Sequence, residues 1–260
     1  MDSAGPRHGG RGLTIRAGLA ALGLALALGS PSAQAGALPS GFVYLRDVDS
    51  SIQQDIRYAG AHNFVGRPIA GYAAAECVLT EKAAERLRAI QAELLAQNLS
   101  LIVWDCYRPM RAVADFVAWS RNPADAKMKQ EFYPRIDKAR LFALGYVSST
   151  SAHTRGGTVD LGLTAKGASA MSAPTNCAAQ NDRPPGNGVL DFGVGFDCMD
   201  ELAHLNAKGV DPAARRHRET LRSAMERHGF RGYAKEWWHF QLVDEPFPTQ
   251  GFDFPITPRQ

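Results

Sequence analysis

The sequence predicts an α+β fold. Amphipathic segments at helical spacing and short apolar runs are interspersed along the 260 residues without a regular strand–helix–strand rhythm. Hydrophobic residues make up 45% of the chain and charged residues 21%, which is enough apolar surface for a sizeable core in one large or two small domains. These proportions exclude a disordered chain and a small disulfide-stapled protein. The formal net charge of +3 gives no sign of a nucleic-acid-binding surface.

The first residues, 1–35, have the pattern of a secretory signal peptide, with a basic start, an apolar run and a small-residue cleavage site. The apolar run is too short to span a bilayer comfortably, and no later run is long enough for a transmembrane helix. We therefore expect residues 36–260 to be exported, periplasmic or secreted, with no membrane anchor after cleavage. An uncleaved anchor or a core helix is the alternative. The basic start contains Arg7, Arg11 and Arg16, the apolar run is residues 17–29, and the cleavage site is Ala33-Gln34-Ala35.

Four cysteines remain in the expected exported chain: Cys77, Cys106, Cys177 and Cys198. An even number of cysteines in an oxidising compartment favours disulfides. Their order along the chain suggests that Cys77 pairs with Cys106 and Cys177 with Cys198. Buried free thiols stay open as the alternative.

The first half of the exported chain carries clear helix and strand signals after a mixed start. Residues 42–75 are rich in turn residues. Thr80 can cap a helix over residues 81–98, where apolar side chains recur at helical spacing. The apolar run Leu101–Trp104 predicts a buried strand, and Pro109 stands at the first turn of a further helix.

Glycine, proline and capping signals divide the second half into short elements. A glycine after periodic residues ends a helix, and an Asp-Pro pair supplies a cap and a first turn. A stretch rich in Pro, Asn and Gly is expected at the surface. The predicted segments are a helix over 137–144 ended by Gly145, a loop over 148–158, a strand over 159–163, a loop over 173–188, a helix from Asp211-Pro212 to His228, and two strands or one hairpin within 230–244.

A first chemical signal lies in the segment Ser151–Asp160. A glycine-containing loop carries His153, and the start of the following predicted strand carries Asp160. A neutral imidazole and a carboxylate are suitable ligands for zinc. The pattern is weak by itself, and a polar loop with an ordinary capping aspartate is the alternative.

A second cluster, Glu236-Trp237-Trp238-His239, lies in the predicted C-terminal strands. Residues three apart in a strand point to opposite faces, so we expect a turn at Trp237 or Trp238 to bring Glu236 and His239 to one cavity. One of them would then bind metal and the other would hold a water molecule, while the tryptophans exclude solvent. The alternative is an aromatic core strand with a surface glutamate and a hydrogen-bonded histidine.

A third cluster, Asp105–Pro109, directly follows the predicted buried strand. Strand ends that enter loops are common positions for functional residues. Because Arg108 precedes a proline, its backbone is expected to be extended, and its guanidinium could face an anionic substrate or a developing oxyanion. The alternative is a surface ion pair between Arg108 and Asp105.

Taken together, the three clusters resemble the zinc D-alanyl-D-alanine dipeptidases of the VanX type, within the zinc D,D-peptidases that share a fold with Hedgehog domains. The motifs are Tyr-Arg-Pro, Ser-x-His-x-x-Gly-x-x-x-Asp and Glu-x-Trp-His. The resemblance extends over residues 40–256, and the paired tryptophans separate the dipeptidases from their carboxypeptidase relatives. Similar segments outside the clusters are Asn63–Pro68, Phe196–Glu201 and Phe252–Pro255.

The resemblance implies both a fold and a catalytic arrangement. The fold would be a single domain, residues 36–260, with a small central antiparallel sheet flanked by helices. His153, Asp160 and His239 would bind one zinc ion, which leaves a fourth position for water. Glu236 would act as the general base for that water, and Arg108 would stabilise the transition state.

The implied activity is hydrolysis of the dipeptide D-alanyl-D-alanine to two D-alanines. Ser151 and Asp197 match positions that hold the substrate's free ammonium, and a buried carboxylate there would select a free N-terminus. A D,D-carboxypeptidase or endopeptidase acting on peptidoglycan stems is the alternative, followed by a non-catalytic zinc domain that binds peptide. The chain departs from the family at Cys106, where resistance-type enzymes have glycine; a bridge to Cys77 would anchor the arginine loop.

Overall fold

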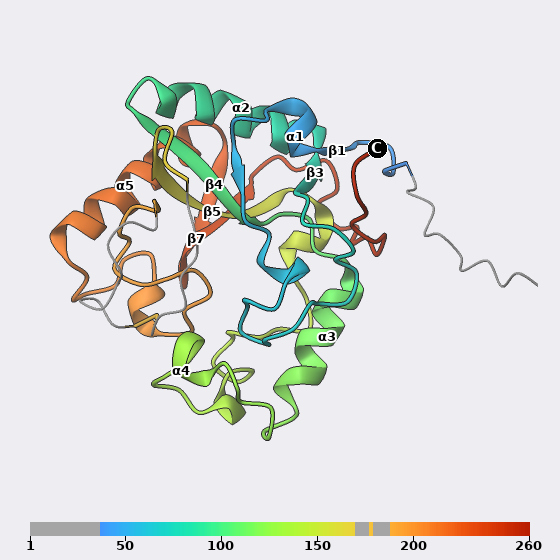
Figure 1. The fold of residues 1–260 in the computed structure, drawn as a ribbon, viewed down its shortest axis with the longest axis vertical. Helices are drawn as coiled ribbons and strands as arrows, with labels where there is room; N and C mark the ends of the chain where they lie inside the picture. Colours follow the sequence, from blue (N-terminus) through green and yellow to red (C-terminus); the bar gives the residue numbers. More distant parts are fainter. Residues whose placement is uncertain (1–36, 170–176, 179–187) are drawn as a thin grey trace, which may run out of the picture. The chain divides into compact units, whose positions relative to one another are not determined.

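A five-stranded sheet in the order β2-β4-β5-β7-β6 forms the centre of the computed structural model (Figure 1). Three long strands, β4 (Leu99–Asp105), β5 (Thr158–Ala165) and β7 (Glu236–Leu242), are antiparallel neighbours. At one edge β6 (Phe230–Tyr233) pairs antiparallel with β7, and at the other the short β2 (Gln53–Gln54) pairs parallel with β4. The predicted α+β class with a small, mainly antiparallel sheet is confirmed, and the parallel edge strand is an addition to it.

The structure describes residues 37–169, 177–178 and 188–260. The predicted leader, residues 1–35, lies outside these residues, as does most of the predicted loop 173–188. Within the described ranges, no helix combines the length and the apolar character that crossing a membrane would require.

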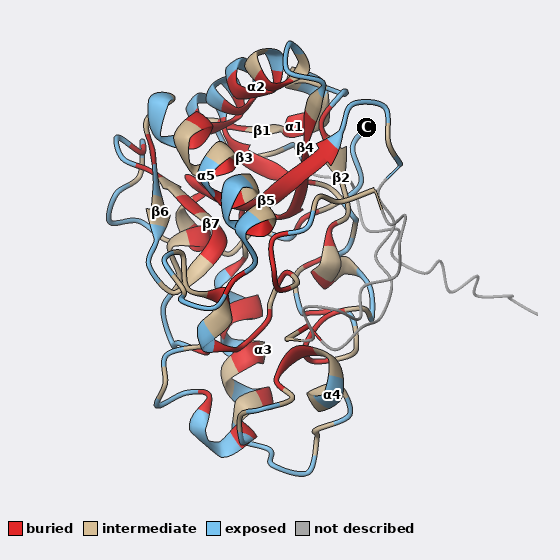
Figure 2. Ribbon diagram, turned by 90° about the vertical axis from the view of Figure 1, so that its left-hand side faces the viewer, coloured by how far each residue is buried: buried red, intermediate tan, exposed pale blue. Residues whose placement is uncertain are grey.

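The two long amphipathic helices lie against the sheet with their apolar sides buried (Figure 2). Helix α2 (Glu81–Leu95) is capped by the Thr80 hydroxyl, which accepts a hydrogen bond from the backbone of Ala83, and it contacts β4. Helix α5 (Pro212–Arg227) has the predicted aspartate cap and first-turn proline, and it contacts β5 and β6. These two helices contact each other, so one apolar core joins them to the sheet.

A second, two-stranded sheet pairs β1 (Phe42–Tyr44) antiparallel with β3 (Val78–Thr80). Helix α3 (Met110–Ser120) begins one residue after Pro109, as the sequence predicts. The other predicted helices and strands agree with the structure to within a few residues at each end. The remaining short helices are α1 (Leu45–Val48), α4 (Lys129–Phe132) and the 3₁₀ helices η1 (Arg57–Ala59), η2 (Lys138–Arg140), η3 (Ala152–Arg155) and η4 (Glu201–Ala203).

The helix predicted over residues 137–144 is wrong. Only a 3₁₀ turn, Lys138–Arg140, forms in this segment. The side chain of Lys138 is buried, and its ammonium donates to the backbone carbonyls of Asn122 and Asp125 at 2.6 and 2.5 Å. This contact fixes the segment against the preceding loop. The segment is also short, so its few helical hydrogen bonds would not offset the cost of nucleating a full helix.

Candidate active site and metal centre

Strand register places three polar residues in a row across the sheet. On neighbouring strands β4, β5 and β7, Asp105 is opposite Asp160, and Asp160 is opposite His239. Residues directly opposite in an antiparallel pair have neighbouring side chains. The row therefore brings a carboxylate and an imidazole together although 79 positions separate Asp160 from His239 in the sequence.

His153 reaches this row from the 3₁₀ helix η3. The Ser151 hydroxyl caps the helix by accepting a hydrogen bond from the His153 backbone N–H at 3.3 Å. Gly156 ends it with a φ of 76°, and a Cβ at this position would lie 2.3 Å from the Phe42 ring. A glycine is therefore required for the tight return that holds His153 over β5.

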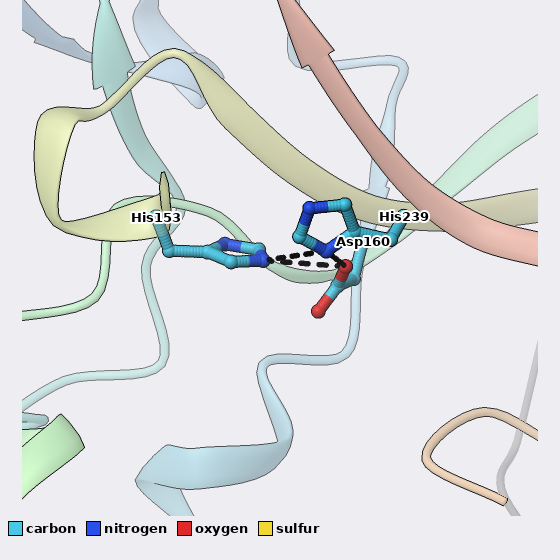
Figure 3. Close-up of side chains that lie close together, drawn as sticks. All are labelled: His153, Asp160 and His239. Atoms are coloured by element: carbon cyan, nitrogen blue, oxygen red, sulfur yellow. Dashed lines mark hydrogen bonds and ion pairs between the residues drawn. The ribbon is translucent and has the colours of Figure 1, made fainter. Parts of the chain in front are cut away.

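The side chains of His153, Asp160 and His239 point at one another (Figure 3). His153 Nε2 lies 3.3 Å from Asp160 Oδ1, His239 Nδ1 lies 3.1 Å from the same oxygen, and the two ring nitrogens are 3.2 Å apart. Asp160 Oδ1 is buried and no well-directed protein donor satisfies it. Burial raises the pKa of Asp160, but the neighbouring histidines outweigh burial and hold this pKa below its ordinary value.

This donor set fits a small divalent cation. The Nδ1 of His153 contacts the Cys106 carbonyl at 2.7 Å, so in the neutral ring Nδ1–H donates to that carbonyl and Nε2 presents a lone pair to Asp160 and His239. Tetrahedral bonds of about 2.0–2.1 Å place ligand atoms about 3.3 Å apart, close to the observed separations. The group is a candidate metal site with three protein ligands, the number typical of catalytic centres.

Arg108 lies beside the metal site, and its largely buried guanidinium packs against two aromatic rings. Its guanidinium carbon is 5.2 Å from the ring centres of both Tyr58 and Phe116. Its Nη2 lies 2.7 Å from Asp105 Oδ2 and 3.7 Å from Asp160 Oδ2. The ion pair considered as an alternative thus forms, but it is buried instead of exposed. Burial lowers the pKa of Arg108, but the surrounding acidic groups, Asp105 first among them, together outweigh burial and raise this pKa, so the guanidinium stays positive.

Two further side chains that sequence analysis did not select complete this network. Tyr72 donates a hydrogen bond to Asp105 Oδ1 at 2.5 Å, and Tyr58 donates one to Asp197 Oδ2 at 2.9 Å. Asp105 is fully buried, so it orients Arg108 without competition from water. The position of Asp105 at a strand end was a usable signal, whereas neither tyrosine stands out within the turn-rich segment.

Glu236 is the first residue of β7, and its Oε2 lies 3.4 Å from His239 Nδ1. The turn expected at the two tryptophans is wrong. Instead, Tyr233 pairs with Glu236 while Gly232 pairs with Phe240, so the intervening residues of β7 bulge out of the ladder. Burial raises the pKa of the Glu236 carboxyl, and the charge of His239 opposes this.

Asp197 and Ser151 lie in the same cavity as the metal residues. Asp197 has a φ of 59°, a left-handed conformation that Asp tolerates better than most residues. Burial raises the pKa of its carboxyl well above the ordinary value, and the charge of Asp160 adds to this effect. A cation bound beside Asp197 would oppose both effects and favour the carboxylate.

The cavity has a volume of about 310 Å³. Apolar side chains, including Phe64, Phe116 and Trp238, form part of its wall. Every side chain predicted to bind metal, substrate or a proton lines this single cavity: Arg108, Ser151, His153, Asp160, Asp197, Glu236 and His239.

Both predicted disulfides are present, so the free-thiol alternative is wrong. Cys77 is bonded to Cys106, and Cys177 to Cys198. Cys106 directly follows Asp105 and lies two residues before Arg108, and Cys198 directly follows Asp197. The first bridge therefore contacts the cavity residue His153 through the Cys106 carbonyl, and the second contributes Cys198 to the cavity wall.

Comparison with known proteins supplies a family match. A family model described as D-ala-D-ala dipeptidase matches residues 39–176 and 180–257. A D-alanyl-D-alanine dipeptidase of Enterococcus faecalis is 36% identical over 220 residues, which cover 85% of this chain and 100% of the relative. Another from Streptomyces coelicolor is 38% identical over 215 residues, covering 83% of this chain and 98% of the relative.

A solved structure is also similar, though only weakly. It is the vancomycin-resistance D,D-dipeptidase VanXYg in complex with a D-Ala-D-Ala phosphinate analog, with 17% sequence identity and a TM-score of 0.35. The match covers 80% of this chain and 68% of that chain. At this TM-score the likeness adds nothing to the argument from the family and the cavity.

Proposed function

The chain belongs to the D-Ala-D-Ala dipeptidase family, a family of zinc metallopeptidases, and from this premise we propose that its cavity hydrolyses D-alanyl-D-alanine to two D-alanines. The observation that carries the proposal is the convergence of one largely buried His–Asp–His group with a nearby glutamate and a separate half-buried aspartate in a single cavity. A metal site alone would need neither of the two extra carboxylates.

We propose that one zinc ion binds His153, Asp160 and His239. When bound, zinc acts as a Lewis acid that polarises a peptide carbonyl and makes water acidic enough to lose a proton near pH 7. The protein contributes three ligand atoms already directed at one point, and the Cys106 carbonyl fixes the ring orientation of His153.

Glu236 is proposed to carry the proton. Its carboxylate lies beside His239 Nδ1, so it can accept a proton from the attacking water and return it to the leaving amine. Burial raises its pKa toward the range in which a carboxylate can perform both transfers. The tryptophan next to it in the cavity wall, Trp238, helps exclude bulk water from these transfers.

Arg108 is proposed to stabilise the oxyanion that forms on the substrate carbonyl. A guanidinium has five N–H donors, more than the contact with Asp105 engages. The rings of Tyr58 and Phe116 pack against the guanidinium, and together with Asp105 they restrict its movement. A donor held in place before the reaction costs no reorganisation in the transition state.

Asp197 and Ser151 are proposed to hold the free ammonium of the dipeptide. A buried carboxylate left without a cation is costly, so a substrate with a capped or extended N-terminus would bind poorly. Tyr58 orients the Asp197 carboxylate through its hydroxyl. This arrangement favours a dipeptide over a longer peptidoglycan stem.

The test is an assay of the purified protein with D-Ala-D-Ala, a D,D-tripeptide and L-Ala-L-Ala. We expect cleavage of D-Ala-D-Ala alone, loss of activity with a chelator, and recovery when zinc is added back. Efficient cleavage of the tripeptide would instead support the carboxypeptidase alternative. Activity that survives complete metal removal would contradict the proposal.

We also propose that the enzyme works outside the inner membrane, on D-Ala-D-Ala released there. The pattern of residues 1–35 and the two disulfides support export, because disulfides persist mainly in oxidising compartments. An exported enzyme cannot reach the cytoplasmic dipeptide that feeds cell-wall precursors. Cell fractionation with N-terminal sequencing tests this: activity that stays in the cytosol on an uncleaved chain would contradict it.

A further inference from the structure

The Cys77–Cys106 disulfide lies directly behind the metal site. The carbonyl of Cys106 accepts the Nδ1–H hydrogen bond of His153 at 2.7 Å. Both cysteines are almost completely buried, at 0% and 2% exposure. The residue that orients a proposed metal ligand through its backbone is therefore covalently tied through its side chain.

The loop that contains Cys106 has little other support from the sheet. Strand β4 ends at Asp105, so Cys106 lies beyond the last ladder position. After it, the Tyr107 N–H donates to the Val78 carbonyl at 2.8 Å, and the Arg108 N–H donates to the His153 carbonyl at 3.2 Å. The loop thus links β3 to the turn that holds His153.

Cys77, at the other end of the bridge, is fixed by its own hydrogen bonds. Its N–H donates to the Gln54 side chain at 2.9 Å, and its carbonyl accepts from the Leu45 N–H at 2.9 Å. Because Cys77 is held in place, its disulfide restricts the movement of the loop that contains Cys106.

From these contacts we propose that the Cys77–Cys106 disulfide is a positioning device that holds His153 in its metal-binding orientation and Arg108 beside it. The inference rests on the proposed zinc site. Loss of the bridge lets the Cys106 carbonyl move, so the His153 ring loses its fixed orientation. Removing such outer partners of a metal ligand typically weakens metal binding about 10- to 100-fold. Metal retention would then depend on the redox state of this one bridge.

The second disulfide provides a matched control in the same chain. Cys177 donates its N–H to the Glu131 carbonyl at 2.8 Å, and Cys198 follows Asp197, the proposed ammonium-binding residue. Cys198 lines the same cavity as His153, Asp160 and His239, but no hydrogen bond or ion pair in the described part of the chain joins this bridge to them. Its loss is expected to change the KM for the dipeptide and leave the zinc dissociation constant within about threefold of wild type.

The experiment compares the double variants C77A/C106A and C177A/C198A with wild type. Zinc dissociation constants are measured by competition with a chromophoric chelator, kcat and KM at saturating zinc, and thermal unfolding of the metal-free proteins. We expect C77A/C106A to bind zinc roughly 10- to 100-fold more weakly and to lose kcat, and C177A/C198A to change KM instead.

Equal zinc affinity in all three proteins would overturn the inference. So would an equal loss of zinc affinity in both variants, or a loss that merely follows the fall in unfolding temperature, because either result indicates a general structural role. If wild type itself fails to bind zinc or to cleave the dipeptide, the proposed function fails instead, and the two failures are distinguishable.

A second measurement on the wild-type chain covers the case in which C77A/C106A does not fold. Zinc-loaded protein is treated with increasing concentrations of a phosphine reductant until both bridges open, and the freed thiols are alkylated and assigned by peptide mapping. Zinc release is followed in parallel. Release that follows opening of Cys77–Cys106 supports the inference, and zinc that stays bound after this bridge has opened overturns it.

Discussion

The two walls of the cavity are built in different ways. One, here the sheet wall, consists of Asp160, His239 and Glu236 on adjacent strands β5 and β7. The other, here the loop wall, consists of Tyr58 on a 3₁₀ turn and Asp197 in an irregular segment. The sheet wall carries the proposed metal and proton chemistry, and the loop wall carries the proposed recognition of the dipeptide's ammonium.

The difference lies in what holds each wall. Strand β7 pairs with β5 at His239 itself and with β6 at Glu236 and Phe240, on either side of the bulge, so the backbone around His239 has little freedom. The loop wall depends on single ties, such as the Tyr58–Asp197 hydrogen bond and the Cys177–Cys198 bridge. Two of the three proposed metal ligands and the proposed base lie on the rigid wall, His153 and Arg108 join them from a 3₁₀ helix and a loop, and recognition of the ammonium lies on the adaptable wall.

The largest expected effect comes from the sheet wall. Glu236→Gln keeps the size of the side chain but removes the group that accepts and returns the proton. We expect kcat for D-Ala-D-Ala to fall about 10²- to 10⁴-fold with zinc content unchanged. Steady-state kinetics and metal analysis of the same sample check this. Turnover near the wild-type rate would remove Glu236 from its proposed role.

A smaller effect is expected from the loop wall. Asp197→Asn leaves the substrate ammonium without its counter-charge, so the KM for the dipeptide should rise and kcat/KM should fall about 10- to 100-fold. The zinc dissociation constant should change far less than the KM, because no hydrogen bond or ion pair among the described residues joins Asp197 to His153, Asp160 or His239. A variant that loses zinc but keeps its KM would erase the distinction between the two walls.

The same variant, which is expected to lose activity, should gain stability, and the gain should depend on pH. Burial raises the pKa of Asp197 in the folded protein well above its unfolded value, so the native state binds the extra proton. The cost of ionising this group is absent below the unfolded pKa and grows as pH rises toward the folded pKa. The metal-free Asp197→Asn variant should therefore unfold at a higher temperature than wild type at neutral pH, and at a similar temperature near pH 4. The same difference in unfolding temperature between variant and wild type at both pH values would contradict this.

The smallest effect is expected at a tie that supports the loop wall from outside. The carboxylate of Asp115 on α3 accepts two hydrogen bonds from Arg67, at 2.8 and 2.6 Å, and this pairing lowers the Asp115 pKa. The stabilisation is present above the unfolded pKa and is lost as pH falls through the folded pKa. Asp115→Asn should cost about 1 kcal/mol at neutral pH.

Chemical denaturation at neutral and acidic pH measures this difference, which should vanish in acid. Zinc affinity should be unaffected, since Arg67 and Asp115 lie away from the strands that carry the metal residues. An unchanged midpoint at neutral pH would show that the segment 63–72 needs no support from α3.

Most of the residues of both walls could be predicted from sequence because they occur in short motifs that follow one another in the same order as in the dipeptidase family. His153 and Asp160 lie in one short segment, as do Glu236 and His239. Asp105 could be selected from its position at a strand end, but Tyr58 and Tyr72 could not be selected from the sequence. Their roles depend on burial and on hydrogen bonds to residues far away in the chain, such as the 139 positions between Tyr58 and Asp197.

The fold was predictable to a similar extent and for a related reason. The long helices α2 and α5 have capping residues and apolar spacing that act locally. The two-residue strand β2 exists only because it pairs with β4, and the bulge in β7 depends on pairing with β6. Local sequence carries no record of either partner.

The position of β7 between β5 and β6 has a consequence for how the active enzyme comes into being. His153 and Asp160 can reach their folded positions before His239 does, since 86 positions separate the two histidines. Pairings this distant in sequence form slowly, because loop closure precedes the contacts that reward it. The dipeptidase therefore has no complete metal site until β7 has docked. Under the export proposed above, a chain that is still unfolded during export would be inactive toward the cytoplasmic dipeptide pool.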